Sequence, residues 1–213
     1  MILKILLRNI KKFIYCLRQS HVKARYYRNI RFEIRKKKKL NVGSGSVEFD
    51  KEWFSCDIDQ LDITKRREWV KLLGNSKVTN IFAEHVWEHL SYEDTNLANK
   101  NCYIFLKKNG RLRIAVPDGY HPNKDYIDYV KPNGNGIGSD DHKILYNYNS
   151  LSQKLKEAGF KTELLEYWDE TGKFHFQDWS NDGGKVNRSR RFDSRNINGK
   201  LNYTSLIIDA IKI

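Results

Sequence analysis

Cysteines, acidic residues near the N-terminus and uninterrupted apolar runs are all scarce in this sequence of 213 residues. The three cysteines, Cys16, Cys56 and Cys102, lie far apart and form no C-x-x-C pair. This spacing excludes a disulfide framework and indicates a reducing, cytoplasmic compartment. Hydrophobic residues make up 39% of the chain and aromatic residues 13%, which is typical of a globular protein with a full core.

Acidic residues are almost absent from residues 1–39. This segment holds 14 of the 39 lysines and arginines but only one of the 26 acids, Glu33, whereas residues 40–213 hold 25 of each sign. The net charge of +13 therefore lies entirely in the N-terminal segment. A folded part without net charge disfavours nucleic acid as the partner. We expect two parts, a basic arm over residues 1–39 and one domain over residues 40–213.

The arm also lacks an apolar run long enough for a signal peptide or a membrane span, because lysines and arginines interrupt it. Its spacing predicts a basic amphipathic helix instead. Two interpretations stay open. Residues 1–20 could lie on an anionic membrane surface at the inner face of the membrane, or a terminal helix could pack on its own domain. The apolar face consists of Ile2, Leu3, Leu6, Leu7, Ile10, Phe13, Ile14 and Leu17.

Beyond the arm, apolar strand patterns alternate with helical ones. This order predicts an α/β fold with a mostly parallel sheet and helices on both faces. The last two strands have no helix between them, so we expect them to pair antiparallel. Strands are predicted at 40–42, 53–58, 78–83, 111–116, 161–167 and 201–211, and helices at 65–73, from Ser91 to about residue 106, and from Asn149 or Ser150 to residue 158.

Two long segments, 119–148 and 168–200, have no regular pattern. Long irregular segments inside a compact domain are commonly functional. Both follow the carboxyl ends of predicted parallel strands, the edge at which open α/β sheets bind ligands. The sequence therefore predicts the ligand site at this edge.

The first strand runs into a glycine turn, LNVGSGS, over residues 40–46. Gly43 and Gly45 allow a sharp turn and a close approach of a ligand to the main chain. A dinucleotide site needs a third glycine three residues later, where this chain has Glu48, so a ligand without phosphates fits better. The second strand ends at Asp57 and Asp59, which suit the two hydroxyls of a ribose.

At this point the sequence resembles the class I S-adenosylmethionine (SAM)-dependent methyltransferases. More narrowly, it is similar to bacterial methyltransferases found among cell-surface glycan genes. The resemblance covers the chain from about residue 40 to the C-terminus. It rests on LNVGSGS, CDID, EHVWEHL, LKKNGRLRIAVPD, DHKILYNYNSL with EAGF, and RSRRFDSRN with LNYTSLIIDA.

The resemblance implies a Rossmann-like, seven-stranded sheet with an antiparallel last strand, and SAM as the cofactor. It implies that Gly43, Ser44 and Gly45 border the methionine part, that Asp57 and Asp59 hold the ribose, that Asp62 lies near the adenine, and that Glu84 and His85 line the pocket floor. One departure is that only four residues separate Asp57 from Asp62, which leaves almost no room for the usual helix there.

A second interpretation applies to EHVWEHL, residues 84–90, because His85, Glu88 and His89 spell the H-x-x-E-H signature of a zinc hydrolase. Zinc would need both histidines on one helical face and a third ligand from elsewhere. The segment instead predicts a strand that turns into a short helix, with His85 at the junction. We therefore predict no metal site, and a histidine bonded to nearby backbone at position 89.

Methyl transfer to a hydroxyl requires alignment and the removal of a proton. His142 and His85 are the predicted catalytic bases, ahead of Asp118 and His121. In the second irregular segment, aromatic residues and arginines suit a glycan or sugar-linked acceptor. Alternatively, the aromatic residues form a small core and the arginines pair with Asp178, Asp182 and Asp193. These aromatic residues and arginines are Trp168, Trp179, Phe174, Phe176, Arg188, Arg190 and Arg191.

The sequence thus predicts a cytoplasmic enzyme, peripheral to the membrane if the arm binds lipid, that methylates oxygen on a cell-surface glycan or sugar-linked precursor. The alternative from another class is a non-catalytic adaptor that uses the basic arm to bind a membrane or nucleic acid. Cofactor binding separates the two.

Overall fold

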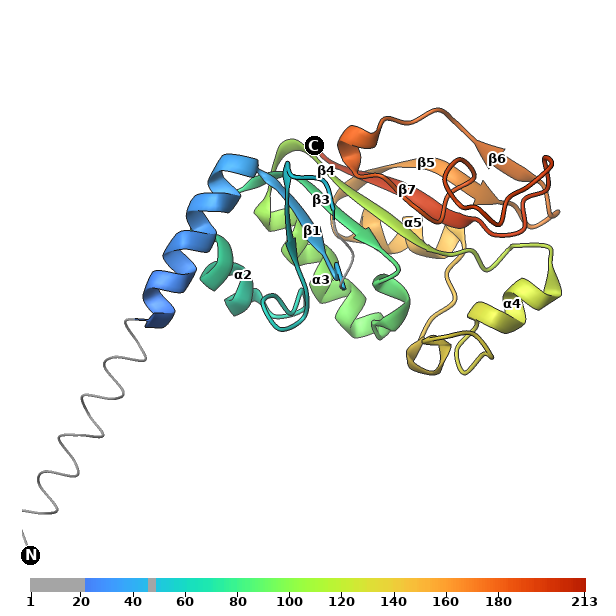
Figure 1. Cartoon of the computed structure of the whole chain (residues 1–213), viewed down its shortest axis with the longest axis horizontal. Coiled ribbons are helices and arrows are strands. Elements are labelled where there is room, and N and C mark those ends of the chain that lie inside the picture. The colour runs from blue at the N-terminus through green and yellow to red at the C-terminus, as the bar shows by residue number, and fades with distance from the viewer. Residues whose placement is uncertain (1–21, 46–48) are drawn as a thin grey trace, which may run out of the picture.

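The computed structural model of the protein describes residues 22–45 and 49–213 (Figure 1). Its helices and strands alternate along the chain much as the sequence predicts. The elements are β1 (Lys39–Val42), β2 (Trp53–Cys56), α2 (Arg66–Leu73), β3 (Val78–Glu84), η1 (Trp87–His89), α3 (Tyr92–Phe105), β4 (Leu106–Pro117), α4 (Lys124–Val130), η2 (Ser139–Asp141), α5 (Tyr148–Glu157), β5 (Phe160–Trp168), β6 (Phe174–Phe176), η3 (Asn181–Gly183) and β7 (Ser205–Lys212).

The strands form one seven-stranded sheet in the order β2-β1-β3-β4-β7-β5-β6. β1 pairs in parallel with β2 and β3, and β3 pairs in parallel with β4. β7 is inserted antiparallel between β4 and β5. This confirms the predicted α/β sheet, including the antiparallel last strand. The seventh strand is β6, which pairs antiparallel with the end of β5 and was not among the strands read from the sequence.

The two faces of the sheet are covered differently. On one face, α2, α3 and α5 pack on a large core around Trp69, Ile81 and Leu155, and Figure 1 shows these helices together below the strands. On the other face, Phe82 and Ile207 pack under Trp179 and Val186, which belong to the segment between β6 and β7. The prediction of helices on both faces is therefore corrected: the second face is covered by irregular chain.

Some element boundaries differ from the predicted ones for local reasons. The strand predicted at 111–116 begins earlier, at Leu106, and a register shift against β3 and a left-handed Asn109 (φ 59°) absorb the extra residues. α5 begins after Asn147, whose side chain and that of Ser150 form a reciprocal capping box. The segment 119–148, expected to be irregular, contains α4, capped by Asn123.

Residues 22–37 are helical and pack against the domain. Ile30 and Ile34 are buried in the large core, and Arg31 donates hydrogen bonds to the carbonyls of Lys71 and Val70 at the end of α2. The predicted amphipathic helix over residues 1–20 lies outside the described residues. In the part of the chain that the structure describes, no helix is long and apolar enough to cross a membrane.

Candidate active site

The glycine turn after β1 adopts the conformation that its sequence requires. Gly43 and Gly45 have φ values of 63° and 54°, in the left-handed region that favours glycine. A side chain at Gly43 would also collide with Val86, so the turn and the segment after β3 approach each other closely. The backbone N–H of Ser44 donates to the carbonyl of Cys56 at 3.2 Å, which fixes the turn against the end of β2.

Asp57 stands directly behind this turn. Its Oδ2 accepts the N–H of Gly45 at 2.7 Å, and its Oδ1 accepts the N–H of Ile58 at 2.7 Å. The carboxylate therefore joins the ends of the first two strands, as expected from its place in the sequence. Each carboxylate oxygen can accept a further hydrogen bond, so Asp57 can hold the turn and still receive a hydroxyl from a ligand.

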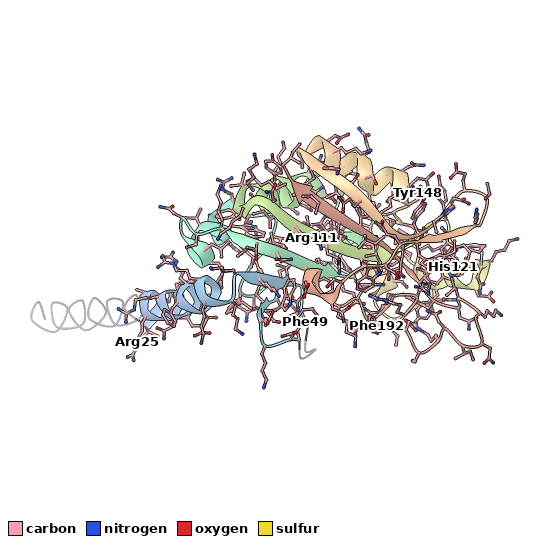
Figure 2. All side chains as sticks on the ribbon, turned by 90° about the horizontal axis from the view of Figure 1, so that it is seen from above. Arg25, Phe49, Arg111, His121, Tyr148 and Phe192 are labelled. Carbon is pink, nitrogen blue, oxygen red and sulfur yellow. The ribbon has the colours of Figure 1, made fainter. Side chains whose placement is uncertain are left out.

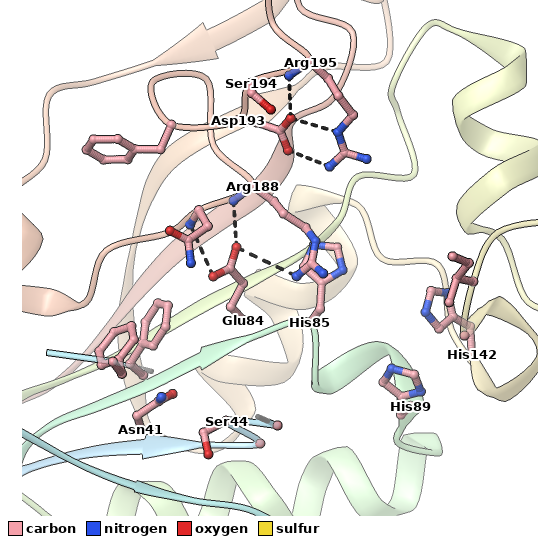
Figure 3. Close-up of a pocket in the computed structure, with 18 residues that line it drawn as sticks. Asn41, Ser44, Glu84, His85, His89, His142, Arg188, Asp193, Ser194 and Arg195 are labelled. Atoms are coloured by element: carbon pink, nitrogen blue, oxygen red, sulfur yellow. Dashed lines mark hydrogen bonds and ion pairs between the residues drawn. The ribbon is translucent and has the colours of Figure 1, made fainter. Parts of the chain in front are cut away.

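A cavity of about 650 Å³ opens in front of the turn (Figure 3). Its lining comes from residues within 41–45, 84–89, 137–142 and 187–195, together with Phe49 and Phe82. These segments follow β1, β3, α4 and β6, so the cavity lies where the carboxyl ends of the parallel strands meet. The structure thus brings Gly43, Ser44, Gly45, Glu84, His85 and His142 to one site.

Glu84 lines the cavity, as predicted for its floor, but its carboxylate is already bound to protein. Oε1 accepts the N–H of Arg188 at 2.7 Å, Oε2 accepts the N–H of Asn187 at 3.2 Å, and the Arg188 guanidinium lies 4.0 Å from Oε1. Glu84 therefore fastens the segment before β7 across the end of β3. This contact builds one wall of the cavity from residues more than 100 positions away.

His85 occupies the junction after β3, where the sequence places it. Its φ of 57° is uncommon for a residue other than glycine and is often found at functional sites. Nε2 lies 3.1 Å from Ser205 Oγ, and Nδ1 lies 3.0 Å from Glu88 Oε1. The His85 ring also stacks on Tyr203. His85 is thus turned away from His89, and the two histidines do not form the paired ligands that a zinc-hydrolase motif needs.

His89 and His142 meet at the other end of the cavity. Their rings lie edge to face with centroids 4.8 Å apart, and Figure 3 shows them side by side, away from Ser44. His142 Nδ1 lies 2.7 Å from the carbonyl of Val130, and His89 Nδ1 lies 3.1 Å from Asp141 Oδ2. The expectation that His89 bonds to nearby backbone is therefore wrong for its ring, which pairs with a side chain 52 residues away.

The structure does not bring Asp59 and Asp62 to this cavity. They line a separate hollow beside Tyr27. Asp62 accepts hydrogen bonds from the N–H and the hydroxyl of Thr64 and pairs with Lys65 at 2.6 Å. Although burial raises the pKa of Asp62, these contacts with Lys65 and Thr64 hold it below its usual value. Asp62 thus shapes the entry to α2.

Asp118 and His121, the other two predicted bases, are structural. Asp118 is fully buried and accepts the N–H groups of Tyr120 and Trp168 at 3.0 and 2.8 Å. Burial raises the pKa of Asp118 to about 6. The His121 ring stacks on Tyr126 with centroids 3.9 Å apart, and burial lowers the pKa of His121 to about 4.

The arginine-rich segment contributes differently from what its composition predicts. Trp179 is buried in the second core and stacks under the guanidinium of Arg191, so the core interpretation holds for this pair. Arg188 lines the cavity, while Arg190 stacks on Phe176. Asp193 pairs with Arg195, not with the arginines considered in the sequence.

Several lining residues were not found from the sequence: Asn41, Phe49, Phe82, Ile137, Phe192 and Arg195. Asn41 did carry a signal, since a polar residue inside a short buried strand is unusual. Phe49 and Phe192 lie on the side of the sheet away from Tyr148 and α5 (Figure 2). They reach the cavity only because irregular chain covers that face, which periodicity does not reveal.

No family model matches the sequence, and no curated protein matches it either. Among solved structures, the chain resembles a SAM-dependent methyltransferase from Archaeoglobus fulgidus, with 21% identity, a TM-score of 0.46, and coverage of 91% of this chain and 94% of the other. It resembles one from Thermotoga maritima with 12% identity, a TM-score of 0.48, and coverage of 95% and 97%.

A phosphoethanolamine N-methyltransferase from Haemonchus contortus in complex with SAM is also similar, with 12% identity, a TM-score of 0.43, and coverage of 82% of this chain and 48% of the other. These likenesses carry no conclusion about the activity or the cofactor of this chain. Their identities and TM-scores are low, and the proposal below depends instead on the geometry of the cavity.

Proposed function

We propose that this protein is a SAM-dependent methyltransferase that methylates a hydroxyl of a sugar-containing acceptor. The observation that supports it best is the glycine turn: two left-handed glycines line one end of a cavity of about 650 Å³, and Asp57, which does not itself line the cavity, accepts the N–H of Gly45 behind them. That volume lies within the usual range for small-molecule sites. The other end carries imidazole rings that a reacting hydroxyl can approach.

The residues at the turn fit SAM. Without side chains, Gly43 and Gly45 leave main-chain groups open to the cofactor's amino-acid part. Asp57 has unused acceptor capacity for ribose hydroxyls. The missing phosphate-binding glycine agrees with a cofactor that has no phosphate. When bound, SAM supplies a methyl group on a positively charged sulfur.

The remaining residues position the acceptor and exclude water. Phe49, Phe82 and Phe192 supply apolar surface in the cavity, and Arg188 supplies a cation. Aromatic faces suit sugar rings, and arginine suits phosphate or carboxylate on a sugar-linked precursor. His142 has its Nδ1 occupied by the Val130 carbonyl, so its other nitrogen is free to act on the acceptor hydroxyl.

A transfer assay tests this proposal. The full chain is incubated with SAM carrying a radiolabelled methyl group and, in parallel, with extracted glycolipids, free sugars and RNA. We expect label in a glycolipid or sugar fraction that depends on the enzyme. Label only in RNA would contradict the acceptor class, and absence of label in all fractions, together with no cofactor binding, would favour the adaptor alternative.

We further propose that the basic arm places the enzyme at an anionic membrane. The helix over residues 22–37 leaves Val22, Tyr26 and Phe32 exposed while Ile30 and Ile34 are buried, so the arm can present apolar side chains beside its positive charges. Deletion of residues 1–21 spares Ile30 and Ile34. We expect this deletion to abolish sedimentation with anionic vesicles, and unchanged sedimentation would contradict the membrane role.

A further inference from the structure

A cluster of potential metal ligands occupies the histidine end of the cavity. Glu88, His89 and His142 each offer one ligating atom, and these atoms lie within 4.8 Å of one another. His89 and His142 line the cavity, so a cation held here would face the acceptor. The sequence predicts no metal, because it places His85 at a strand–helix junction and offers His142, 53 residues from His89, only as a base.

Glu88 needs a positive partner. Its side chain is 1% exposed, its Oε1 lies 3.0 Å from His85 Nδ1, and its Oε2 has no hydrogen-bond partner among the described residues. A buried carboxylate oxygen without a hydrogen bond is unfavourable unless a cation is close.

The two histidines are oriented as metal ligands commonly are. The Nδ1 of His142 faces the Val130 carbonyl at 2.7 Å, and the Nδ1 of His89 faces the Asp141 carboxylate at 3.1 Å. Such acceptors hold the proton on Nδ1 and leave Nε2 with a free electron pair, which is the arrangement that supports a ligating histidine. Within the described chain, neither Nε2 has a hydrogen-bond partner of its own.

Backbone contacts hold the two halves of the cluster together. The carbonyl of Glu88 accepts the N–H groups of Lys143 at 2.7 Å and Ile144 at 3.2 Å. His142 is therefore fixed against η1 by main-chain bonds that involve the residue before His89. The cluster is built into the fold and does not depend on long, mobile side chains.

We propose that Glu88, His89 and His142 bind one divalent cation of the first transition row at the acceptor end of the cavity. Two imidazoles and one carboxylate form a known ligand set for such ions and leave coordination positions open. With bonds of about 2.1 Å, neighbouring ligand atoms lie roughly 3.0–3.5 Å apart. The cluster must therefore tighten by about 1–2 Å, within reach of side-chain rotation.

The role of this cation rests on the proposed methyltransferase function. Bound to the acceptor hydroxyl, the cation lowers the pKa of that hydroxyl and fixes its direction. The hydroxyl proton passes to solvent water, the oxygen electron pair forms the bond to the methyl carbon, and the carbon–sulfur bond breaks with its pair on sulfur. In this arrangement His142 holds the cation and is not the base.

The test uses the full chain after removal of metals with EDTA, titrated with Co²⁺ as a probe and followed by visible absorption. We expect one equivalent to bind with the spectrum of a nitrogen- and oxygen-ligated ion. His89→Gln and His142→Gln should each weaken binding at least about 10-fold. His175→Gln is the matched control, because His175, on β6, pairs with Asp169 and does not line the cavity. Circular dichroism verifies that each variant is folded.

Binding of S-adenosylhomocysteine to the same proteins separates the two proposals. If the chain binds this nucleoside, but Co²⁺ binds weakly and equally in all variants, the metal proposal is overturned and the proposed function stands. If Co²⁺ binds through the three residues while the nucleoside does not bind, the metal site stands and the proposed function fails. Where both bind, EDTA should reduce methyl transfer at least about 10-fold, and full transfer in EDTA would refute the role in catalysis.

Discussion

The pair of Arg113 and Asp209 lies in the centre of the sheet and offers a sharp test of the fold. The two residues face each other in the β4–β7 register, and the guanidinium donates to both carboxylate oxygens at 2.7 and 2.9 Å. Arg113 has no exposed surface, and the Asp209 side chain is 3% exposed. Arg113 also donates to the carbonyls of Ser180 and Gly184, and so ties the covering segment to the sheet.

The substitution Asp209→Asn keeps the shape of the side chain but removes the charge that compensates the buried guanidinium. Breaking a buried pair in this way commonly costs about 3–5 kcal/mol. The two carbonyls still hold Arg113, so we expect a loss near the lower limit, about 3 kcal/mol in the free energy of unfolding. For a chain of this length, the midpoint of thermal unfolding should fall by roughly 6–12 °C.

Urea denaturation followed by circular dichroism measures this loss. Glu163→Gln is the matched control, because Glu163, on β5, pairs in register with Asp209 on β7. The Glu163 side chain is 42% exposed, and its only ion-pair partner in the described chain, Lys161, lies 3.7 Å away. We expect a change below about 0.5 kcal/mol there. A loss under about 1 kcal/mol in Asp209→Asn, or equal losses in both variants, would refute this account of the buried pair.

Three further outcomes follow from particular residues. Because burial raises the pKa of Asp118 to about 6 from 3.8, its ionisation in the folded state lowers stability as pH rises through that window, by up to about 3 kcal/mol. Asp118→Asn should therefore gain stability relative to the parent chain as pH rises from 4 to 7 in urea titrations. A difference in the free energy of unfolding between the two proteins that does not change with pH would contradict this. Burial lowers the pKa of His121 to about 4, so stability is lost as pH falls from about 6.5. His121→Gln should therefore gain stability relative to the parent chain as pH falls through this range, the opposite pH direction from Asp118→Asn, and a difference that does not change with pH would contradict this. Gly43→Ala should have a lower free energy of unfolding in urea than Gly45→Ala, by about 1 kcal/mol or more. Both residues have positive φ, but only a side chain at position 43 would collide with Val86. Equal urea midpoints for the two variants would show that the contact between Gly43 and Val86 can relax.

Local sequence signals predicted the parts of the fold that depend on neighbouring residues. Ser91 caps α3 through the N–H of Asp94, and Gly74 ends α2, as their positions indicate. The glycine turn and Asp57 could be placed together because strand ends in a parallel sheet meet at one edge. These predictions needed only periodicity and turn chemistry.

The remaining features depend on contacts between distant residues, which periodicity does not encode. Glu84 binds the backbone of Arg188 across 104 positions, and His89 meets His142 because main-chain bonds join η1 to the segment after η2. β6 exists only as the partner of β5, and its three residues are too few for a recognisable strand pattern. The sequence therefore did not predict the cavity wall around Arg188, although it did predict Glu84 and His85 at the cavity floor.

Calorimetric titration of the full chain with S-adenosylhomocysteine tests the central claim most directly, with Asp57→Asn and the exposed Asp128→Asn as a matched pair of variants. The account predicts one site per chain with a dissociation constant on the order of 1 μM. Affinity should fall at least about 10-fold in Asp57→Asn, because a charge-assisted hydrogen bond is lost, and should stay unchanged in Asp128→Asn. Absence of binding to the parent chain, or equal affinity in all three proteins, would contradict a cofactor site built on Gly43, Gly45 and Asp57.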